Sequence, residues 1–187
     1  KESDSLTFLT KTRSTYYEHK GLDFDTEYCY QIASEDGDGD EGPMSPVMCG
    51  YVLPPPHLTL IEKKFVENTG NGMLDGRENG WAIFKVVNDG RSPARELKPW
   101  LKPEDGTMTP SLKIDSVETI PLLAVGDTVQ IEFSIYAKLK IESGDRNFFF
   151  RVEEFSGMDL EPEPISFPTL KVTPPNLVVT DFAVDNE

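Results

Sequence analysis

The stretch GLDFDTEYCYQIASEDGDGDEGPMSPVMCGYV, residues 21–52, alternates apolar and polar side chains through its first half. The apolar and aromatic set, with one threonine, recurs at every second residue: Leu22, Phe24, Thr26, Tyr28, Tyr30 and Ile32. This period is typical of a β-strand with one face buried, so the aromatic set is expected to point inward. A second apolar run, residues 45–52, follows a connection rich in Asp and Gly. The pattern predicts two paired strands of an all-β fold.

The two cysteines, Cys29 and Cys49, lie on these two expected strands. Hairpin pairing would bring their sulfur atoms face to face, and we expect a disulfide bond between them. In the chain-entropy view, a bond that closes a loop of this length stabilises the fold by roughly 3 kcal/mol. Disulfides persist in oxidising compartments, so the pair predicts an extracellular or cell-surface location. The alternative is two free thiols at the surface.

Residues 22–32 resemble the L-x-P-x-T-x-Y-x-V-x-V signature of fibronectin type III domains, with Phe24 in place of the usual proline. The flanks of the two cysteines likewise resemble the hairpins of bacterial members of that family. The resemblance implies that Tyr28 is the corner tyrosine, with its hydroxyl bonded to nearby backbone. It also implies that residues 5–10 and 14–18 are the two preceding strands, and that residues 1–53 are the C-terminal part of such a domain.

Consecutive prolines at residues 54–56 predict an extended linker, because proline favours the polyproline conformation and cannot donate to a β-ladder. Beyond it, alternating apolar residues separated by turn signals predict seven strands and no helix, which indicates an immunoglobulin-like sandwich over residues 54–171. The expected strands are residues 58–66, 80–88, 97–101, 113–123, 128–137, 147–155 and 163–170.

Two segments of this central region, residues 68–78 and FKVVNDGRSPAREL at 84–97, resemble the adhesion-related Ig-like modules of bacterial surface and secreted proteins. In such proteins similar modules occur in tandem, sometimes appended to peptidase domains. Residues 174–187 repeat the pattern of residues 55–68, so residues 172–187 are expected to be a linker and the first strand of a further module. The fold expectation is therefore tandem immunoglobulin-like β-sandwiches.

The loop of residues 67–78 carries oxygen-bearing groups at the spacing of an EF-hand calcium loop, with Gly72 at the sixth position. The predicted Ca²⁺ ligands are Glu67, Thr69, Asn71, the Met73 carbonyl, Asp75 and Glu78. Hard oxygen donors suit Ca²⁺ better than a transition metal. The alternative is a loop in which Asn and Gly only supply turn conformations.

A second acidic cluster, residues 35–41, lies in the connection between the cysteine strands and is here termed the acidic tip. Asp alternates with Gly in it, but the twelfth position from Asp36 is Val47, so the closing carboxylate of a calcium loop is missing. We interpret the acidic tip as a solvated hairpin tip.

Charge and motifs disfavour several classes of function. Thirty-three acidic against eighteen basic residues give a formal net charge of −15, which would repel nucleic acid. No apolar run approaches the roughly 20 residues that span a bilayer, so membrane insertion of this segment is not expected. The two histidines, His19 and His57, have no zinc-site spacing. Trp81 and Trp100 could line a sugar-binding surface, although in a sandwich they more often pack in the core or between domains.

The sequence thus predicts a noncatalytic structural or adhesive segment, such as a stalk, filament or spacer, of a multidomain secreted or cell-surface protein. The alternative is an accessory region, binding carbohydrate or protein, of a large secreted hydrolase or peptidase. The expected partners are other protein modules. They include further copies of this chain, if residues 177–184 add as a strand to an incomplete sandwich; the competing explanation is that neighbouring sequence completes it.

Overall fold

The computed structural model describes residues 6–173, and in them the chain forms β-strands without helices. The all-β prediction is therefore confirmed. The strands are β1 (Thr26–Tyr30), β2 (Met48–Val52), β3 (Leu58–Glu67), β4 (Leu74–Asp75), β5 (Asn79–Asn88), β6 (Ala94–Pro103), β7 (Leu112–Ile114), β8 (Ile120–Leu123), β9 (Thr128–Ala137), β10 (Gly144–Glu153) and β11 (Leu160–Leu170).

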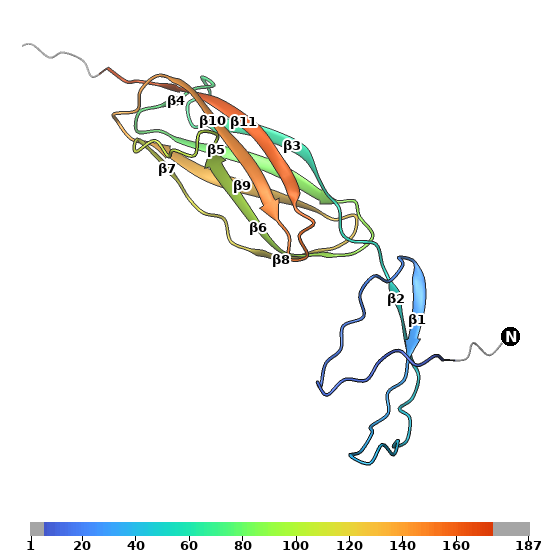
Figure 1. The fold of residues 1–187 in the computed structure, drawn as a ribbon. Helices are drawn as coiled ribbons and strands as arrows, with labels where there is room; N and C mark the ends of the chain where they lie inside the picture. Colours follow the sequence, from blue (N-terminus) through green and yellow to red (C-terminus); the bar gives the residue numbers. More distant parts are fainter. Residues whose placement is uncertain (1–5, 174–187) are drawn as a thin grey trace, which may run out of the picture.

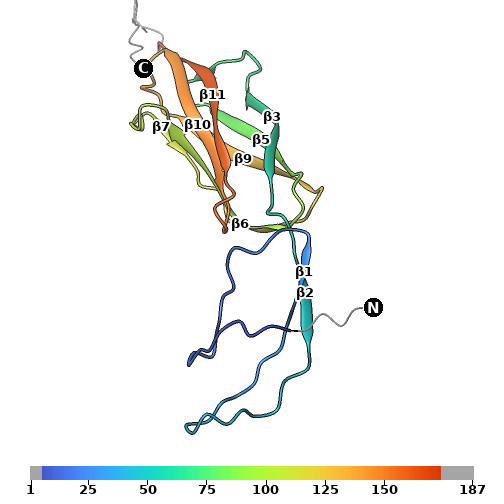
Figure 2. The same cartoon turned by 45° about the vertical axis from the view of Figure 1, so that its right-hand side comes forward.

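Strands β3 to β11 form two sheets that pack face to face (Figure 1). One sheet has five strands in the order β4-β11-β10-β6-β8, and the other has four in the order β3-β5-β9-β7. The long strand pairs are antiparallel, and the short β4 pairs with β11 in parallel. Figures 1 and 2 show β1 and β2 beyond one end of this sandwich, while β11 ends at the opposite end.

Alternation in the sequence decides which side chains meet between the sheets. In β5 the buried positions fall on every second residue, among them Ala82, Phe84 and Val86. Strands β9 and β10 bury Phe133 and Phe150 in the same way. Burial at this period is the sign of sheets with one face on a core, so the alternation predicted from sequence places the core correctly.

Aromatic rings join the two sheets across the core. Phe84 of β5 stacks on Phe150 of β10, with ring centroids 3.8 Å apart and an interplanar angle of 6°. Phe133 of β9 meets both rings edge-on, at 6.1 and 6.2 Å. A second stack, between Phe65 of β3 and Phe167 of β11, spans the sheets with centroids 4.4 Å apart. Aromatic pairs of this kind add to the stabilisation from buried area.

The expected strand at residues 113–123 is wrong as one element. The structure divides it into β7, which pairs with β9 in the four-stranded sheet, and β8, which pairs with β6 in the five-stranded sheet. The chain crosses from one sheet to the other between Ile114 and Ile120. The apolar residues continue from Ile114 through Val117 to Ile120 without a strong turn signal, so the sequence does not reveal that the two ends belong to different sheets.

The first part of the chain departs further from the prediction. The two strands of the cysteine hairpin are present as β1 and β2, but residues 6–10 and 14–18 are not strands. No residue between 6 and 53 is buried. Of the alternating set expected to face inward, Leu22, Thr26 and Tyr28 are half-buried, and the rest are exposed: Phe24, Tyr30 and Ile32, the last at 76%. A two-stranded sheet has no second layer on which to bury a face, which explains the difference.

The segment 177–184, expected to begin a further module, lies outside the described residues. Residues 6–173 contain no helix whose length and hydropathy would let it cross a membrane.

We predict that Phe150→Ala lowers the free energy of unfolding by about 3–5 kcal/mol, because a ring buried between both sheets leaves a cavity when removed. Chemical denaturation monitored by circular dichroism measures this change. The control is Phe155→Ala, which removes a ring that is 72% exposed and should change stability by less than about 0.5 kcal/mol. Equal losses in both variants would show that the stack does not hold the sheets together.

Candidate functional site

The predicted disulfide is present. Cys29 and Cys49 lie directly opposite each other in the β1–β2 register, with Cα atoms 4.0 Å apart, and their sulfur atoms are bonded. The bond joins neighbouring strands in a segment without buried residues, where little else opposes the entropy of the unfolded chain. The disulfide is therefore the main constraint on the hairpin.

Tyr28 makes the contact expected of a corner tyrosine, because its hydroxyl oxygen accepts a hydrogen bond from the Asp23 backbone N–H at 3.1 Å. His19 lies beside this ring and shares a hydrogen bond of 2.8 Å with the hydroxyl of Tyr30. The His19 ring meets Tyr28 and Tyr30 nearly edge-on, at centroid distances of 6.3 and 5.9 Å. These rings form a small aromatic cluster that holds the irregular residues near His19 against β1.

The 67–78 loop connects β3 to β5 at the end of the sandwich. Buried Leu74, in the middle of the loop, anchors it by packing in the core and pairing through β4 with Thr169 of β11. Gly70 and Gly72 have positive φ angles of 75° and 79°, which glycine adopts without strain. The strand β4 was missed from sequence, since two residues are too short for a visible alternation.

The Glu67 carboxylate lies against the backbone of its own loop. Its Oε1 accepts a hydrogen bond from the Gly72 N–H at 2.8 Å, and its Oε2 accepts from the Gly70 N–H at 2.8 Å and the Thr69 hydroxyl at 2.9 Å. These bonds favour the ionised form and lower the pKa of Glu67 from 4.5 to about 2, with the Gly72 N–H as the largest cause.

Glu78 closes the loop from the other side. Its side chain is buried, and its two oxygens accept hydrogen bonds from the N–H groups of Thr69, at 3.0 Å, and Asp75, at 2.8 Å. Asn71 accepts a bond from the Met73 N–H at 2.7 Å and donates one to Asp75 Oδ2 at 3.1 Å. The second Asp75 oxygen, Oδ1, is a buried acceptor without a hydrogen-bond partner.

The six predicted calcium ligands thus share one compact loop, but their carboxylates are directed at different loop amides. No group of three or more His, Cys, Asp or Glu side chains within residues 6–173 is arranged to hold a metal ion. The Glu67 and Glu78 carboxylates accept hydrogen bonds from backbone donors of the loop, a role that the sequence pattern did not indicate. Calcium binding here stays a prediction.

The acidic tip is exposed along its whole length. Asp36 Oδ1 accepts hydrogen bonds from the N–H groups of Asp38, at 3.0 Å, and Asp40, at 2.9 Å. The backbones of Glu35 and Glu41 pair in an isolated antiparallel β-bridge. These contacts make a local turn at the end of the connection, in keeping with the interpretation as a solvated hairpin tip.

The two tryptophans lie on opposite sheets. Trp81 belongs to β5 and Trp100 to β6, and both occupy positions that alternate with buried ones, so their rings face outward from the sandwich. Lys102 Nζ lies 4.3 Å from the centre of the Trp100 ring. The two rings cannot form one shared sugar-binding platform, and neither belongs to the core.

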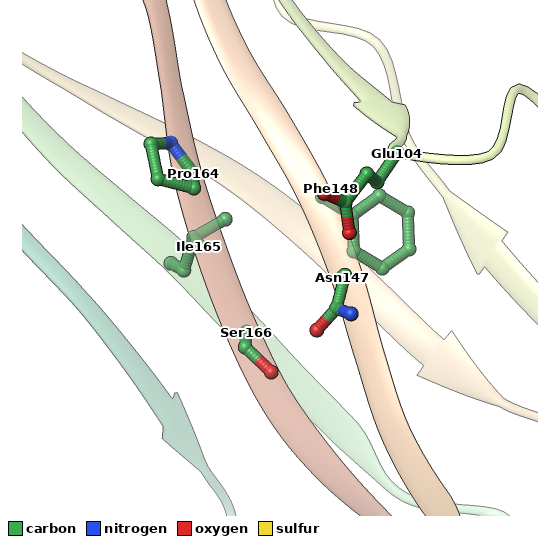
Figure 3. A pocket seen from close by; sticks show the side chains of 6 residues that line it. All are labelled: Glu104, Asn147, Phe148, Pro164, Ile165 and Ser166. Carbon is green, nitrogen blue, oxygen red and sulfur yellow. The ribbon is translucent and has the colours of Figure 1, made fainter.

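A depression of about 350 Å³ lies over neighbouring strands of the five-stranded sheet (Figure 3). Asn147 and Phe148 of β10 contribute to it, together with Glu104 just beyond β6, and Pro164, Ile165 and Ser166 of β11 complete its lining. Glu104 is the one ionisable side chain among these six.

No protein-family profile matches this chain, and no curated protein matches it. Among solved structures, a FixG-related protein from Vibrio parahaemolyticus is similar with a TM-score of 0.39 and 13% identity, over 59% of this chain and 94% of that one. A second similar structure is that of AvmM, a protein described as catalysing macrocyclization in alchivemycin A biosynthesis. Its TM-score is 0.41 and its sequence identity 11%, over 62% of this chain and 92% of that one. A third is a family 123 glycoside hydrolase from Clostridium perfringens, with a TM-score of 0.37 and 12% identity, over 55% of this chain and 23% of that one. These distant likenesses assign neither a family nor a function.

We predict that the Glu67 carboxylate stabilises the fold above pH 4.5, its usual pKa, and that this contribution is lost progressively as the pH falls from 4.5 towards 2. The sign follows from a folded-state pKa that lies below the unfolded one. Thermal unfolding of Glu67→Gln across this range should therefore show a weaker pH dependence than the parent chain. The exposed Glu161→Gln is the control, and an unchanged pH profile in Glu67→Gln would contradict the assignment.

The calcium prediction is tested separately, by thermal unfolding in millimolar Ca²⁺, in Mg²⁺ and in a chelator. The ligand spacing predicts a higher Tm in Ca²⁺ alone, and loss of that increase in Asp75→Asn, because ligand binding stabilises the folded state. Identical Tm values in Ca²⁺ and chelator would mean that hydrogen bonds alone hold the loop.

Proposed function

We propose that this chain is a noncatalytic structural segment of a multidomain secreted or cell-surface protein, where it acts as a spacer through contacts with other protein modules. The path of the chain supports this most directly. The hairpin with the disulfide lies at one end of the sandwich, next to the start of β3, and β11 ends at the other (Figures 1 and 2). Because the chain enters the sandwich at one end and β11 leaves it at the other, the sandwich would hold neighbouring modules apart by its own length.

The domain assignment belongs to the same proposal. Residues 1–53 would be the C-terminal part of a fibronectin type III-like domain, which the hydrogen bond from the Asp23 N–H to Tyr28 supports. The absence of buried residues between 6 and 53 supports it too, because an apolar strand face needs a second layer. Residues 54–171 would be an Ig-like sandwich, and residues 172–187 a linker and the start of a further module.

The proposed location follows from the disulfide. A bond between Cys29 and Cys49 suits an oxidising compartment, and we place the segment outside the cell or at its surface on that ground. Exposed apolar side chains on the hairpin, such as Tyr51 at 65% and Met48 at 72%, would contact other protein modules. Strand addition by a second copy is one form of that contact, with β1 and β2 each offering an edge.

One observation favours the alternative, an accessory region of a secreted hydrolase or peptidase. Trp100 is only partly buried on the outer face of its sheet, with Lys102 over its ring, and such a ring can stack on a sugar. Saturable binding on a glycan array that disappears in Trp100→Ala would favour this alternative over the spacer.

The spacer proposal is tested by pulling the chain from both ends in a single-molecule force experiment. We expect one discrete unfolding event of roughly 380 Å in contour length, because residues 58–170 extend at about 3.4 Å per residue. Reducing agent should add about 70 Å, since the disulfide spans a sequence separation of 20 residues.

The control is a Cys29→Ser, Cys49→Ser double variant, which should show the added length without reductant. Gradual extension of the sandwich, without a discrete event, would contradict the spacer proposal.

A further inference from the structure

The connection between β2 and β3 lies against one loop of the sandwich. This loop, residues 88–92, begins at the last residue of β5 and is here termed the clamp loop. The linker it faces runs over residues 53–57; in it Pro56 is buried, although the hairpin before it contains no buried residue. The linker thus has a docking surface on the sandwich.

Asn88 organises the clamp loop from inside. Its side chain is fully buried, and its Oδ1 accepts hydrogen bonds from the N–H groups of Gly90, at 3.1 Å, and His57, at 3.4 Å. Its Nδ2 donates to the carbonyl oxygens of Ser92, at 2.9 Å, and Leu123, at 3.0 Å. One amide therefore ties the linker to β5 and to the end of β8.

Further hydrogen bonds cross from the clamp loop to the linker. The Asp89 N–H donates to the His57 carbonyl at 3.0 Å, and the Asp89 carboxylate bonds His57 Nδ1 at 2.5 Å. The Ser92 hydroxyl donates to the Pro54 carbonyl at 2.6 Å. A proline-rich segment has few N–H groups but keeps its carbonyls, so a surface that offers donors suits it.

Gly90 allows the two backbones to approach. A Cβ atom at this position would lie 2.3 Å from the His57 nitrogen and 2.7 Å from the Pro56 carbonyl carbon. Both are backbone atoms, which cannot move aside as a flexible side chain can. The contact between clamp loop and linker therefore requires glycine at residue 90.

Arg91 extends the contact to the hairpin itself. Its Nη1 lies 2.6 Å from Asp25 Oδ2, and Asp25 has a positive φ of 57° while its N–H donates to the Val52 carbonyl at 2.7 Å. Aspartate adopts this region of φ more readily than most other non-glycine residues, and here it does so in the turn that leads into β1. An exposed ion pair contributes little by itself and is screened by salt, so it adds to the backbone contacts and does not replace them.

We infer that the clamp loop is an intramolecular docking surface for the proline-rich linker, and that it holds the disulfide hairpin at one fixed angle to the sandwich. This goes beyond the spacer proposal, because a spacer can equally be a flexible tether. The segment that occupies this surface is residues 53–57 of the same chain. The angle is fixed because the clamp loop contacts the linker and, through Arg91, also the hairpin before it.

Residual dipolar couplings of the ¹⁵N-labelled full chain test the inference. One alignment tensor should fit the amides of β1 and β2 together with those of β3 to β11. In Gly90→Ala the two groups should require different tensors, with a smaller degree of order for the hairpin. The matched control is Gly37→Ala, where the added Cβ meets no atom within 4 Å, and it should keep the single tensor.

A second variant covers the case in which Gly90→Ala does not fold. Asp89→Ala with Arg91→Ala and Ser92→Ala removes the three side-chain contacts from the clamp loop to the linker and the hairpin, and leaves Asn88 and the core intact, so the sandwich spectrum should be preserved while the degree of order of the hairpin falls. Two tensors in the parent chain would overturn the inference, and so would a hairpin whose degree of order stays at the parent value in every variant that folds. Neither result would bear on whether the segment is a spacer.

Discussion

The buried amide of Asn88 is the constraint on which the rest of the arrangement depends. It lies where β5 leaves the four-stranded sheet, where β8 ends in the five-stranded sheet and where the linker arrives, and it bonds to all three. Of these bonds the one to the Leu123 carbonyl is buried, and an unpaired acceptor there would cost about 1–3 kcal/mol, while the bonds to His57 and Ser92 are partly open to solvent. The aromatic stack joins the sheets from within, while Asn88 joins them at the end that meets the hairpin.

The two ends of the sandwich are stabilised by different means. At the hairpin end, a neutral amide connects segments distant in sequence. At the other end, the carboxyl side chains of Glu67 and Glu78 accept hydrogen bonds from the amides of their own 67–78 loop, which has little regular pairing beyond β4. Local carboxylates can satisfy a loop without a second segment, whereas the junction needs a group that both accepts and donates.

Sequence alternation was sufficient to predict most of the sandwich, because its long strands bury every second residue, as β5 and β9 do. Alternation was insufficient where contacts between distant segments decide which sheet a strand joins or whether a face is buried. The division of residues 113–123 between two sheets is set by pairing with β9 and with β6, which the local sequence does not show. Burial of the hairpin residues depends on a second layer that local pattern cannot reveal. The disulfide was predictable because hairpin pairing places Cys29 opposite Cys49. The sequence Asn88-Asp89-Gly90 of the clamp loop predicts a turn, but it does not indicate that the linker, residues 53–57, packs on that turn.

The position of the disulfide has a consequence for the exposed connection between its strands. The acidic tip lies inside the covalent ring that Cys29 and Cys49 close, and its residues are open to solvent. A protease that cut the backbone anywhere in this ring would produce two polypeptides that remain covalently joined. The segment can therefore be cleaved in this exposed connection and still connect what lies on its two sides.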